Sequence, residues 1–461
     1  MISYKDLRRP MIDGLLPFLT ATWIVFAAPA DTPELAWHPI AADPAAAPAD
    51  NPLKGFMPYI GEYDLPHSLE YSYVGLAEAM IAPGNYAFET AIDPLLEDAA
   101  SRGHQMVLRV FIDYPDETLS LPQFFIDEGI TLTPYSDHGG GMSPDYDFPA
   151  LVEALEDFIA ALGARYDGDP RLGYFQVGLL GHWGEWHTYP NYSLFPSLAT
   201  QNRILAAFDA AFDETHILVS QDSMGQDPVA NLAATAVGFH DDAFTEGTLG
   251  PDDWMFVPRL NAFGFDERWK TIPMGGEVLP DLQDDILADP PTAPQDYLAC
   301  VGATHATWLL NQYPFDLSPG DAARRERAIA LSRALGYELT VTEAAAQLTT
   351  GALTIGVRIE NTGVAPFPYD WTVTVRLLDS GGEVLETIET PWRLTEVIPG
   401  EPPREWIVEA PIEPQLAACL TEARLWIENP LSGGLPVRFA NEGQNGFGLS
   451  IAQFPHSCPA R

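Results

Sequence analysis

Residues 173–190 read GYFQVGLLGHWGEWHTYP, and this stretch decides the fold that the sequence predicts. Its first half is an apolar run of strand-forming residues, which is typical of a strand buried inside a parallel sheet. Its second half gathers glycine, histidine, tryptophan and glutamate into a few positions. Because the carboxyl ends of the strands carry the chemistry of a (β/α)8 barrel, this change of composition favours that fold.

Seven more short runs rich in β-branched and aromatic residues surround this segment and predict eight strands in all. The strands are expected at 53–59, 71–78, 105–113, 173–180, 216–222, 236–243, 271–277 and 301–310. Helical periodicity predicts helices between several of them, most clearly at 148–166, 200–212 and 321–335. Eight strands with intervening helices over residues 51–336 match an α/β fold, the (β/α)8 TIM barrel. A doubly wound open sheet is the alternative, but its usual Gly-rich phosphate-binding motif does not follow the first strand.

From Tyr337 the helical pattern stops. Segments such as ELTVTEA, ALTIGVRIEN, WTVTVRLLD and REWIVEA alternate apolar and polar residues between turn-forming Gly, Pro, Asn and Asp. Alternation of period two with such breaks predicts an all-β sandwich domain over residues 337–461. We expect this domain to be a stabilising or sugar-contacting accessory without an active site.

The amino terminus has the pattern of an export signal. Three basic residues precede an apolar run over residues 15–28, and Ala-Pro-Ala ends at Ala30. This predicts a signal peptide over residues 1–30 and a secreted or periplasmic protein. An uncleaved membrane anchor or a buried amphipathic helix are the alternatives. Residues 31–50 are rich in Ala, Pro and Asp and are expected to form a linker; no later segment is long and apolar enough to insert stably in a membrane.

The charge of the chain restricts its partners. It has 65 acidic and 23 basic side chains, a net charge of −42, so we expect no nucleic acid as partner, and polyanionic substrates and anionic lipids are disfavoured. Of the three cysteines, Cys419 and Cys458 are placed to form a disulfide in an oxidising compartment, and Cys300 is expected to be a buried thiol at the start of the last strand.

Glu185 is the first candidate catalytic residue. It follows the fourth predicted strand between Trp183 and Trp186, with His187 next to them. Indole rings remove water from a carboxyl group, which raises its pKa and favours the protonated form that a general acid needs. The rings also offer flat faces to a sugar. The alternative is that the aromatic residues and His187 only cap the barrel while Glu185 is solvated.

Glu277 is the second candidate, at the end of the seventh predicted strand in TIPMGGEVLP. The two glycines before it are expected to let the backbone approach a ligand closely. Strands four and seven lie on opposite sides of an eight-stranded ring, so Glu185 and Glu277 are predicted to face each other. Two such carboxyl groups are what glycosidic cleavage requires. Taken alone, Glu277 could equally be a turn residue or a surface acid.

Other polar and aromatic residues at predicted strand ends complete the expected substrate-binding set. This set contains Trp183, Trp186, His187, Asp222, His240, Trp308 and Asn311. Imidazole and carboxylate groups can bind divalent metal ions, and this region offers them at His182, His187, Asp222 and Asp241. No fixed ligand spacing such as HExxH accompanies them, so we expect no metal and no cofactor.

NPLKGFMPY at residues 51–59, DPRLGYFQVGLLGHWGEWH at 169–187 and PMGGEVLP at 273–280 resemble an uncharacterised bacterial family of exported, glycoside-hydrolase-like barrels with a carboxy-terminal β-sandwich. The layout is similar to the clan of retaining β-glycosidases. The resemblance implies that Glu185 is the acid/base and Glu277 the nucleophile. In that clan an asparagine that contacts the sugar 2-hydroxyl precedes the first glutamate, whereas this chain has Gly184.

The sequence therefore predicts an exported glycoside hydrolase that cleaves a neutral poly- or oligosaccharide, by a two-glutamate retaining mechanism. A non-catalytic carbohydrate-binding barrel is one alternative, and a metal-assisted hydrolase or a polysaccharide lyase on the same barrel is another. The sequence does not predict the sugar, the linkage or the oligomeric state.

Overall fold

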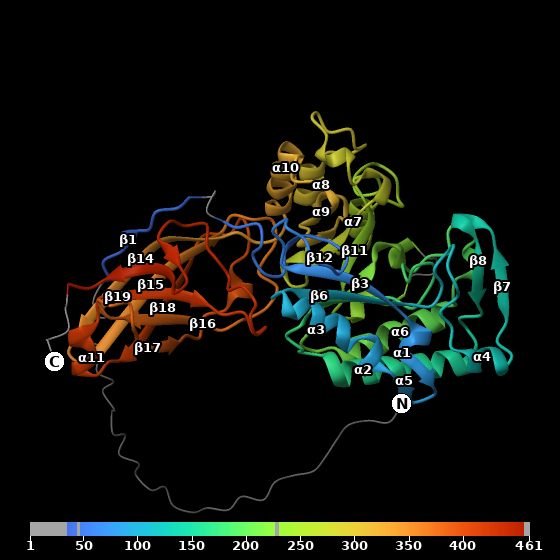
Figure 1. The fold of residues 1–461 in the computed structure, drawn as a ribbon, viewed down its shortest axis with the longest axis horizontal. Coiled ribbons are helices and arrows are strands. Elements are labelled where there is room, and N and C mark those ends of the chain that lie inside the picture. The colour runs from blue at the N-terminus through green and yellow to red at the C-terminus, as the bar shows by residue number, and fades with distance from the viewer. Residues whose placement is uncertain (1–34, 44–46, 226–229, 456–461) are drawn as a thin grey trace, which may run out of the picture. The chain divides into compact units, whose positions relative to one another are not determined.

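The computed structural model describes residues 35–43, 47–225 and 230–455 (Figure 1). The predicted signal peptide, residues 1–30, and Cys458 lie outside the described residues. Within these residues no helix has both the length and the apolar character needed to cross a membrane.

Eight parallel strands form a closed barrel. They are β2 (Gly55–Met57), β3 (Leu69–Gly75), β6 (Gln105–Phe111), β9 (Leu172–Val177), β10 (Ile217–Ser220), β11 (Gly238–Phe244), β12 (Met274–Val278) and β13 (Trp308–Leu310). Their order in the sheet is β2-β13-β12-β11-β10-β9-β6-β3. The ring closes just beyond β2, where the Ile60 N–H donates to the Tyr71 carbonyl and the Tyr71 N–H donates to the Pro58 carbonyl, both at 2.9 Å. The predicted TIM barrel is confirmed.

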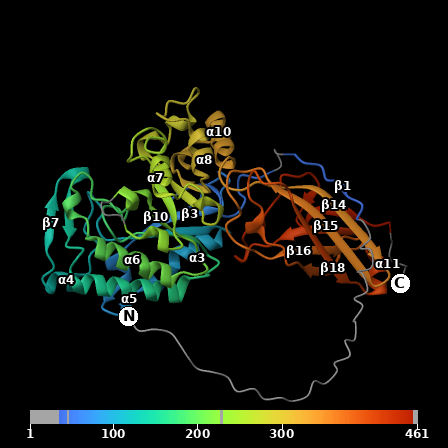
Figure 2. The same ribbon diagram turned by 180° about the vertical axis from the view of Figure 1, so that it is seen from behind.

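Helices link most of the strands. The longest are α3 (Asp93–Ser101), α5 (Pro149–Tyr166), α6 (Leu198–Ala211), α7 (Phe256–Phe263), α8 (Tyr297–Thr304) and α10 (Ala322–Arg333). In Figures 1 and 2, α3, α5 and α6 lie together along one side of the barrel strands. Their apolar faces are buried there, for example Leu155 and Phe158 of α5 and Phe208 of α6. The three helices that periodicity predicted are present within two residues of their expected ends.

The expected strand at 301–310 is wrong in its first half. Residues 301–304 belong to helix α8, and only β13 is a strand. The side chain of Asp296 accepts a hydrogen bond from the Ala299 N–H and so caps the start of this helix. Cys300 is therefore on a helix, although it is a buried free thiol as expected.

Two antiparallel sheets form the carboxy-terminal part of the chain. The first contains β1 (His38–Pro39), β14 (Leu339–Thr349), β15 (Ala352–Asn361) and β18 (Arg404–Pro411), and the second contains β17 (Val384–Glu389), β16 (Val373–Leu378), β19 (Glu422–Ile427), β21 (Gly448–Gln453) and β20 (Gln444–Asn445), each in sheet order. Apolar side chains of both sheets, such as Val357 and Leu425, share one buried cluster. The predicted all-β sandwich is confirmed. Its outer strand β1 comes from the segment expected to be a linker. Cys419 is disulfide-bonded.

Candidate active site

A compact turn after β9 presents Glu185 at the carboxyl end of the barrel. Within it Leu179, Gly181, Trp183, Gly184 and Trp186 all have φ between 52° and 80°. The backbone compensates for this conformation through internal hydrogen bonds, for example from the N–H of residue 182 to the carbonyl of residue 187 at 2.8 Å. The turn therefore holds the glutamate in a fixed position.

Position 184 is crowded for a side chain. A Cβ atom on Gly184 would lie 3.2 Å from the backbone of Gly178 and Leu179 and 3.3 Å from the Val110 carbonyl. A side chain there would thus meet backbone, and this explains why glycine precedes Glu185.

Arg109, in the middle of β6, joins the polar groups of the site. Its Nη1 donates to Glu185 Oε1 at 2.9 Å, and its Nη2 donates to both carboxylate oxygens of Asp242 at 3.1 Å. Its Nε donates to the Gln176 amide oxygen at 2.7 Å. The arginine side chain is 2% exposed, that of Glu185 14% and that of Asp242 10%. Buried charges need such partners. The ion pairs therefore hold Arg109, Glu185 and Asp242 together.

Glu277 lies in β12, in register with Leu310 of β13, and is 8% exposed. Among the described residues its carboxyl group has no hydrogen-bond or ion-pair partner. Burial raises the pKa of Glu277 well above its usual value, the nearby charges of Asp242 and Glu185 raise it further, and Arg109 opposes them. The structure thus brings Glu277 and Glu185 into one electrostatic group.

The glycines before Glu277 serve packing. A Cβ on Gly275 would lie 2.3 Å from the ring of Trp308, and one on Gly276 would lie 2.2 Å from the Asp241 carbonyl. The space that a side chain would need is filled by protein, so packing is enough to explain both glycines.

Aromatic rings continue from the carboxyl groups along the same end of the barrel. Ring centroids are 6.5 Å apart for Tyr59 and Tyr73, 5.6 Å for Tyr73 and Tyr114, and 6.4 Å for Tyr114 and Trp183. Burial, followed by the charge of Glu277, raises the pKa of Tyr59 and of Tyr114. Trp183, a predicted substrate-binding residue, is half-buried here.

His187 and Asp222 belong to the same region. His187 Nε2 lies 3.4 Å from Glu185 Oε2. Burial lowers the pKa of His187, but the hydrogen bond to Glu185 and the charge of Asp222 outweigh it and raise the pKa. Asp222 itself pairs with Arg259 at 2.8 Å.

Trp186 and Trp308, two predicted substrate-binding residues, lie in the core. Both are fully buried. The Trp186 indole N–H donates to the Val177 carbonyl at 2.9 Å, and the Trp308 ring packs 5.7 Å from that of Tyr174. Burial in the core stabilises their apolar rings, and neither ring is exposed to a ligand in this structure.

His240, within β11, and Asn311, just after β13, are buried polar residues. His240 Nδ1 lies 2.9 Å from Asp242 Oδ2, so His240 helps to hold Asp242. The side-chain amide of Asn311 has no hydrogen-bond partner among the described residues.

Sequence reasoning missed the central arginine. Arg109 and Gln176 were hidden inside apolar strand runs, although a charge within QMVLRVF at residues 105–111 was itself a signal, because an arginine is almost never fully buried unless paired.

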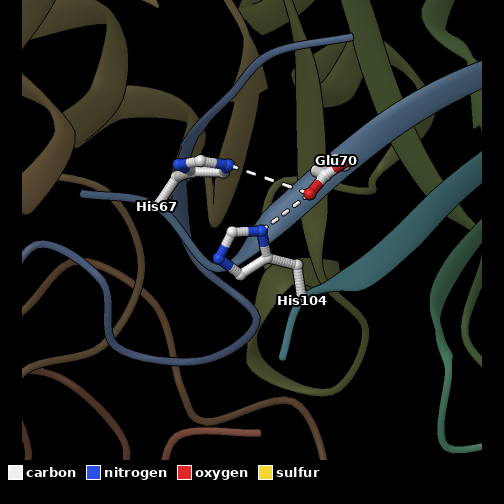
Figure 3. Close-up of side chains that lie close together, drawn as sticks. All are labelled: His67, Glu70 and His104. Atoms are coloured by element: carbon white, nitrogen blue, oxygen red, sulfur yellow. Dashed lines mark hydrogen bonds and ion pairs between the residues drawn. The ribbon is translucent and has the colours of Figure 1, made fainter. Parts of the chain in front are cut away.

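Possible metal ligands are gathered elsewhere. His182 pairs with Asp113 at 2.9 Å, and within the described ranges the four residues considered above form no ligand group. His67, Glu70 and His104 do lie within 4.8 Å of one another, at the amino ends of β3 and β6 (Figure 3).

The Glu70 carboxylate in that group is already occupied. Arg102 donates to its two oxygens at 2.8 and 2.6 Å, the Gly61 N–H donates at 3.1 Å, and His104 Nδ1 lies 2.7 Å away. A metal ion would have to displace these groups beside a guanidinium. The cluster is therefore a structural ion pair at the end of the barrel that usually serves stability.

No family model matches the chain, and no curated protein does. Among solved structures, the chain is similar to endo-glycoceramidase II from Rhodococcus sp. in a cellobiose-like isofagomine complex, at 14% identity and a TM-score of 0.40, over 82% of this chain and 100% of that one. It is also similar to a family 39 glycoside hydrolase from Bacteroides cellulosilyticus WH2, at 11% identity and a TM-score of 0.39, over 74% and 79% of the two chains. Identities this low leave the activity to be argued from this chain's own residues.

Proposed function

We propose that this protein is an exported glycoside hydrolase that cleaves a neutral poly- or oligosaccharide with Glu185 and Glu277. The observation that carries the proposal is the position of these two carboxyl groups on one closed barrel: Glu185 follows β9 and contacts Arg109 at 2.9 Å, and Glu277 is buried in β12. Glycosidic cleavage needs one carboxyl group that gives a proton and one that acts as an anion.

The environments of the two groups differ in the required way. Glu185 faces a guanidinium, whereas Glu277 is buried without a partner among the described residues. The half-buried rings of Tyr59, Tyr114 and Trp183 lie at the same end of the barrel, and aromatic rings are the groups on which a pyranose stacks. A net charge of −42 favours a neutral sugar over an acidic one.

Purified protein incubated with a panel of neutral glycans tests the proposal, with released reducing sugar as the readout. We expect E185Q and E277Q each to lower the rate on natural glycans at least about a hundredfold, the size of a lost acid–base contribution. The control E246Q changes an exposed acid in the loop after β11 and should keep wild-type activity.

Three results would favour the alternatives. Saturable glycan binding without sugar release would indicate a binding protein. Loss of activity with a chelator would indicate a metal-assisted hydrolase. An unsaturated product that absorbs in the ultraviolet would indicate a lyase. Export is tested separately, by whether the protein leaves the cytoplasm and loses residues 1–30.

A further inference from the structure

Two exposed tyrosines lie in the segment that follows the turn around Glu185. Tyr189 is 55% exposed and Tyr192 is 57% exposed, and their ring centroids are 6.1 Å apart. Each ring leaves a large apolar area in contact with water. A single exposed tyrosine is ordinary, but two adjoining rings next to a candidate site form a patch of the kind that marks a binding surface.

His138 joins these tyrosines to the candidate site. It lies between β7 (Leu132–Tyr135) and β8 (Gly141–Pro144). Its ring centroid is 5.1 Å from that of Trp183 and 6.2 Å from that of Tyr189, and its Nε2 lies 2.8 Å from the Tyr189 carbonyl oxygen. The row of aromatic rings at this end of the barrel therefore continues past Trp183 to the exposed tyrosines.

Hydrogen bonds hold the tyrosine segment in place. The Tyr189 N–H donates to His187 Nδ1 at 3.2 Å. The buried Thr188 hydroxyl donates to the Asn191 carbonyl at 2.9 Å, and the Ser193 hydroxyl donates to the Asn191 side-chain oxygen at 2.7 Å. Rings on a segment that is already held lose little conformational freedom when a ligand binds.

The same segment carries no charge. Residues 188–202 contain no charged side chain, although 19% of the whole chain is charged and its net charge is −42. The overall charge repels anionic ligands, and this segment offers no acid to a cationic one. Asn191 and Ser193 are exposed, and their amide and hydroxyl groups can exchange hydrogen bonds with sugar hydroxyl groups. Flat rings beside uncharged polar groups suit a neutral sugar.

We propose that Tyr189 and Tyr192 form an outer sugar-binding subsite, on which a neutral glycan chain continues beyond the unit held at Glu185. This rests on the proposed function and narrows its substrate to chains long enough to cover both rings. Tyr189 is next to His138 and so nearer to Trp183 than Tyr192 is. A growing chain should therefore reach Tyr189 first.

A series of neutral oligosaccharides of one linkage, measured as kcat/KM against chain length, tests the proposal. We expect Y189A and Y192A each to lower the ratio of kcat/KM on the longest chain to that on the shortest at least about fivefold, the size of a lost ring contact. The loss should begin at a shorter chain in Y189A than in Y192A. Y189F and Y192F keep the rings and should keep the ratio.

F263A is the matched control. Phe263 is 42% exposed and is the last residue of α7. Because α7 leads from β11 back to the start of β12, its end lies at the amino ends of the strands, away from the site. F263A should keep the wild-type ratio. A wild-type ratio in both tyrosine-to-alanine variants would overturn the proposal, and so would an equal loss at every chain length.

Binding measurements separate this proposal from the proposed function. In calorimetric titrations of E277Q with the longest oligosaccharides, adding Y192A should raise Kd at least about fivefold. An unchanged Kd would overturn the outer subsite, whether or not the wild-type protein cleaves the glycans. If the wild-type protein cleaves none of them but Y192A raises Kd as expected, the proposed function fails and the subsite stands.

Discussion

Three carboxyl groups and one guanidinium meet where β6, β9, β11 and β12 end. Arg109 contacts Glu185 and Asp242 directly, and the nearby charges lower the pKa of Asp242 in spite of its burial. Glu277 is left without a cation of its own among the described residues. The two glutamates thus differ in whether they contact a cation, and that cation is the buried side chain of Arg109.

Replacing Asp242 tests this asymmetry through the pH dependence of kcat/KM. After burial, the charge of Asp242 is the largest cause that raises the pKa of Glu277, so D242N should lower that pKa. If Glu277 is the acid, the basic limb of the profile moves to lower pH, by about one unit. E246Q is the matched control and should leave both limbs unchanged. Movement of the acidic limb alone would assign Glu277 to the nucleophile role instead.

At the scale of residues, the sequence predicted acids better than aromatic residues. A glutamate at a strand end is expensive to bury without a purpose, so Glu185 and Glu277 stood out. Trp186 and Trp308 pack the core, because a tryptophan beside a strand end gains from burial whether or not a ligand is present. Which way an indole points depends on the φ values of its turn, and the residue pattern does not encode these.

The turn after β9 is the element on which the site depends most. Ala at position 184 would bring both a positive φ of 72° for a non-glycine residue and backbone contacts of 3.2 Å. We expect G184A to reduce the free energy of unfolding by about 1–3 kcal/mol. It should also lower kcat by displacing Glu185.

Urea unfolding and kinetics of the same preparation check this prediction. G302A is the control, since a Cβ at this exposed position of α8 meets open space, and a helical alanine is neutral or stabilising. If G184A matched G302A in both measurements, the turn would not be the rigid element described here.

The ion pair at the opposite end of β3 stabilises the barrel instead. Burial raises the pKa of Glu70, but its hydrogen bonds from Arg102 and His104 outweigh this and lower the pKa to about 2. E70Q should therefore cost about 3 kcal/mol at neutral pH, because Arg102 loses its buried partner. The exposed E97Q on α3 should cost nothing measurable.

The sign of the pH effect follows from the lowered pKa. The contribution of Glu70 is complete above the usual glutamate pKa and is lost as the pH falls through about 2. The difference in unfolding free energy between the wild-type protein and E70Q should shrink over that range. Added zinc ions that raised the unfolding temperature of the wild-type protein, but not of E70Q, would contradict the ion-pair interpretation.

At the scale of elements, the eight barrel strands and the strand segments quoted for the sandwich could be predicted, because each is a short apolar or alternating run with clear breaks. The antiparallel pair β7 (Leu132–Tyr135) and β8 (Gly141–Pro144) was missed, since its residues are largely exposed or half-buried. The start of the last strand was predicted wrongly because a buried helix there looks like a strand. The run YLACVGAT at 297–304 is apolar throughout, and periodicity cannot separate a short buried helix from a strand in such a run.

For the whole molecule, the barrel brings side chains 92 positions apart, Glu185 and Glu277, to the same end of one sheet. The strand order places β11 and β10 between β12 and β9, so the two carboxyl groups approach from different sides of the ring. This is the arrangement that the number of strands predicted. The contacts of Arg109 with the acids could not be predicted, because contacts between side chains of different strands depend on the shear and register of the closed barrel.

The central claim is that one sugar ring binds between these two carboxyl groups. A crystal structure of the protein with a neutral oligosaccharide that it cleaves, soaked into E277Q crystals, tests this most directly. We predict that the glycosidic bond of the sugar lies between the side chains of residues 185 and 277. A sugar bound only away from these two side chains, together with full activity of E185Q and E277Q, would contradict the account.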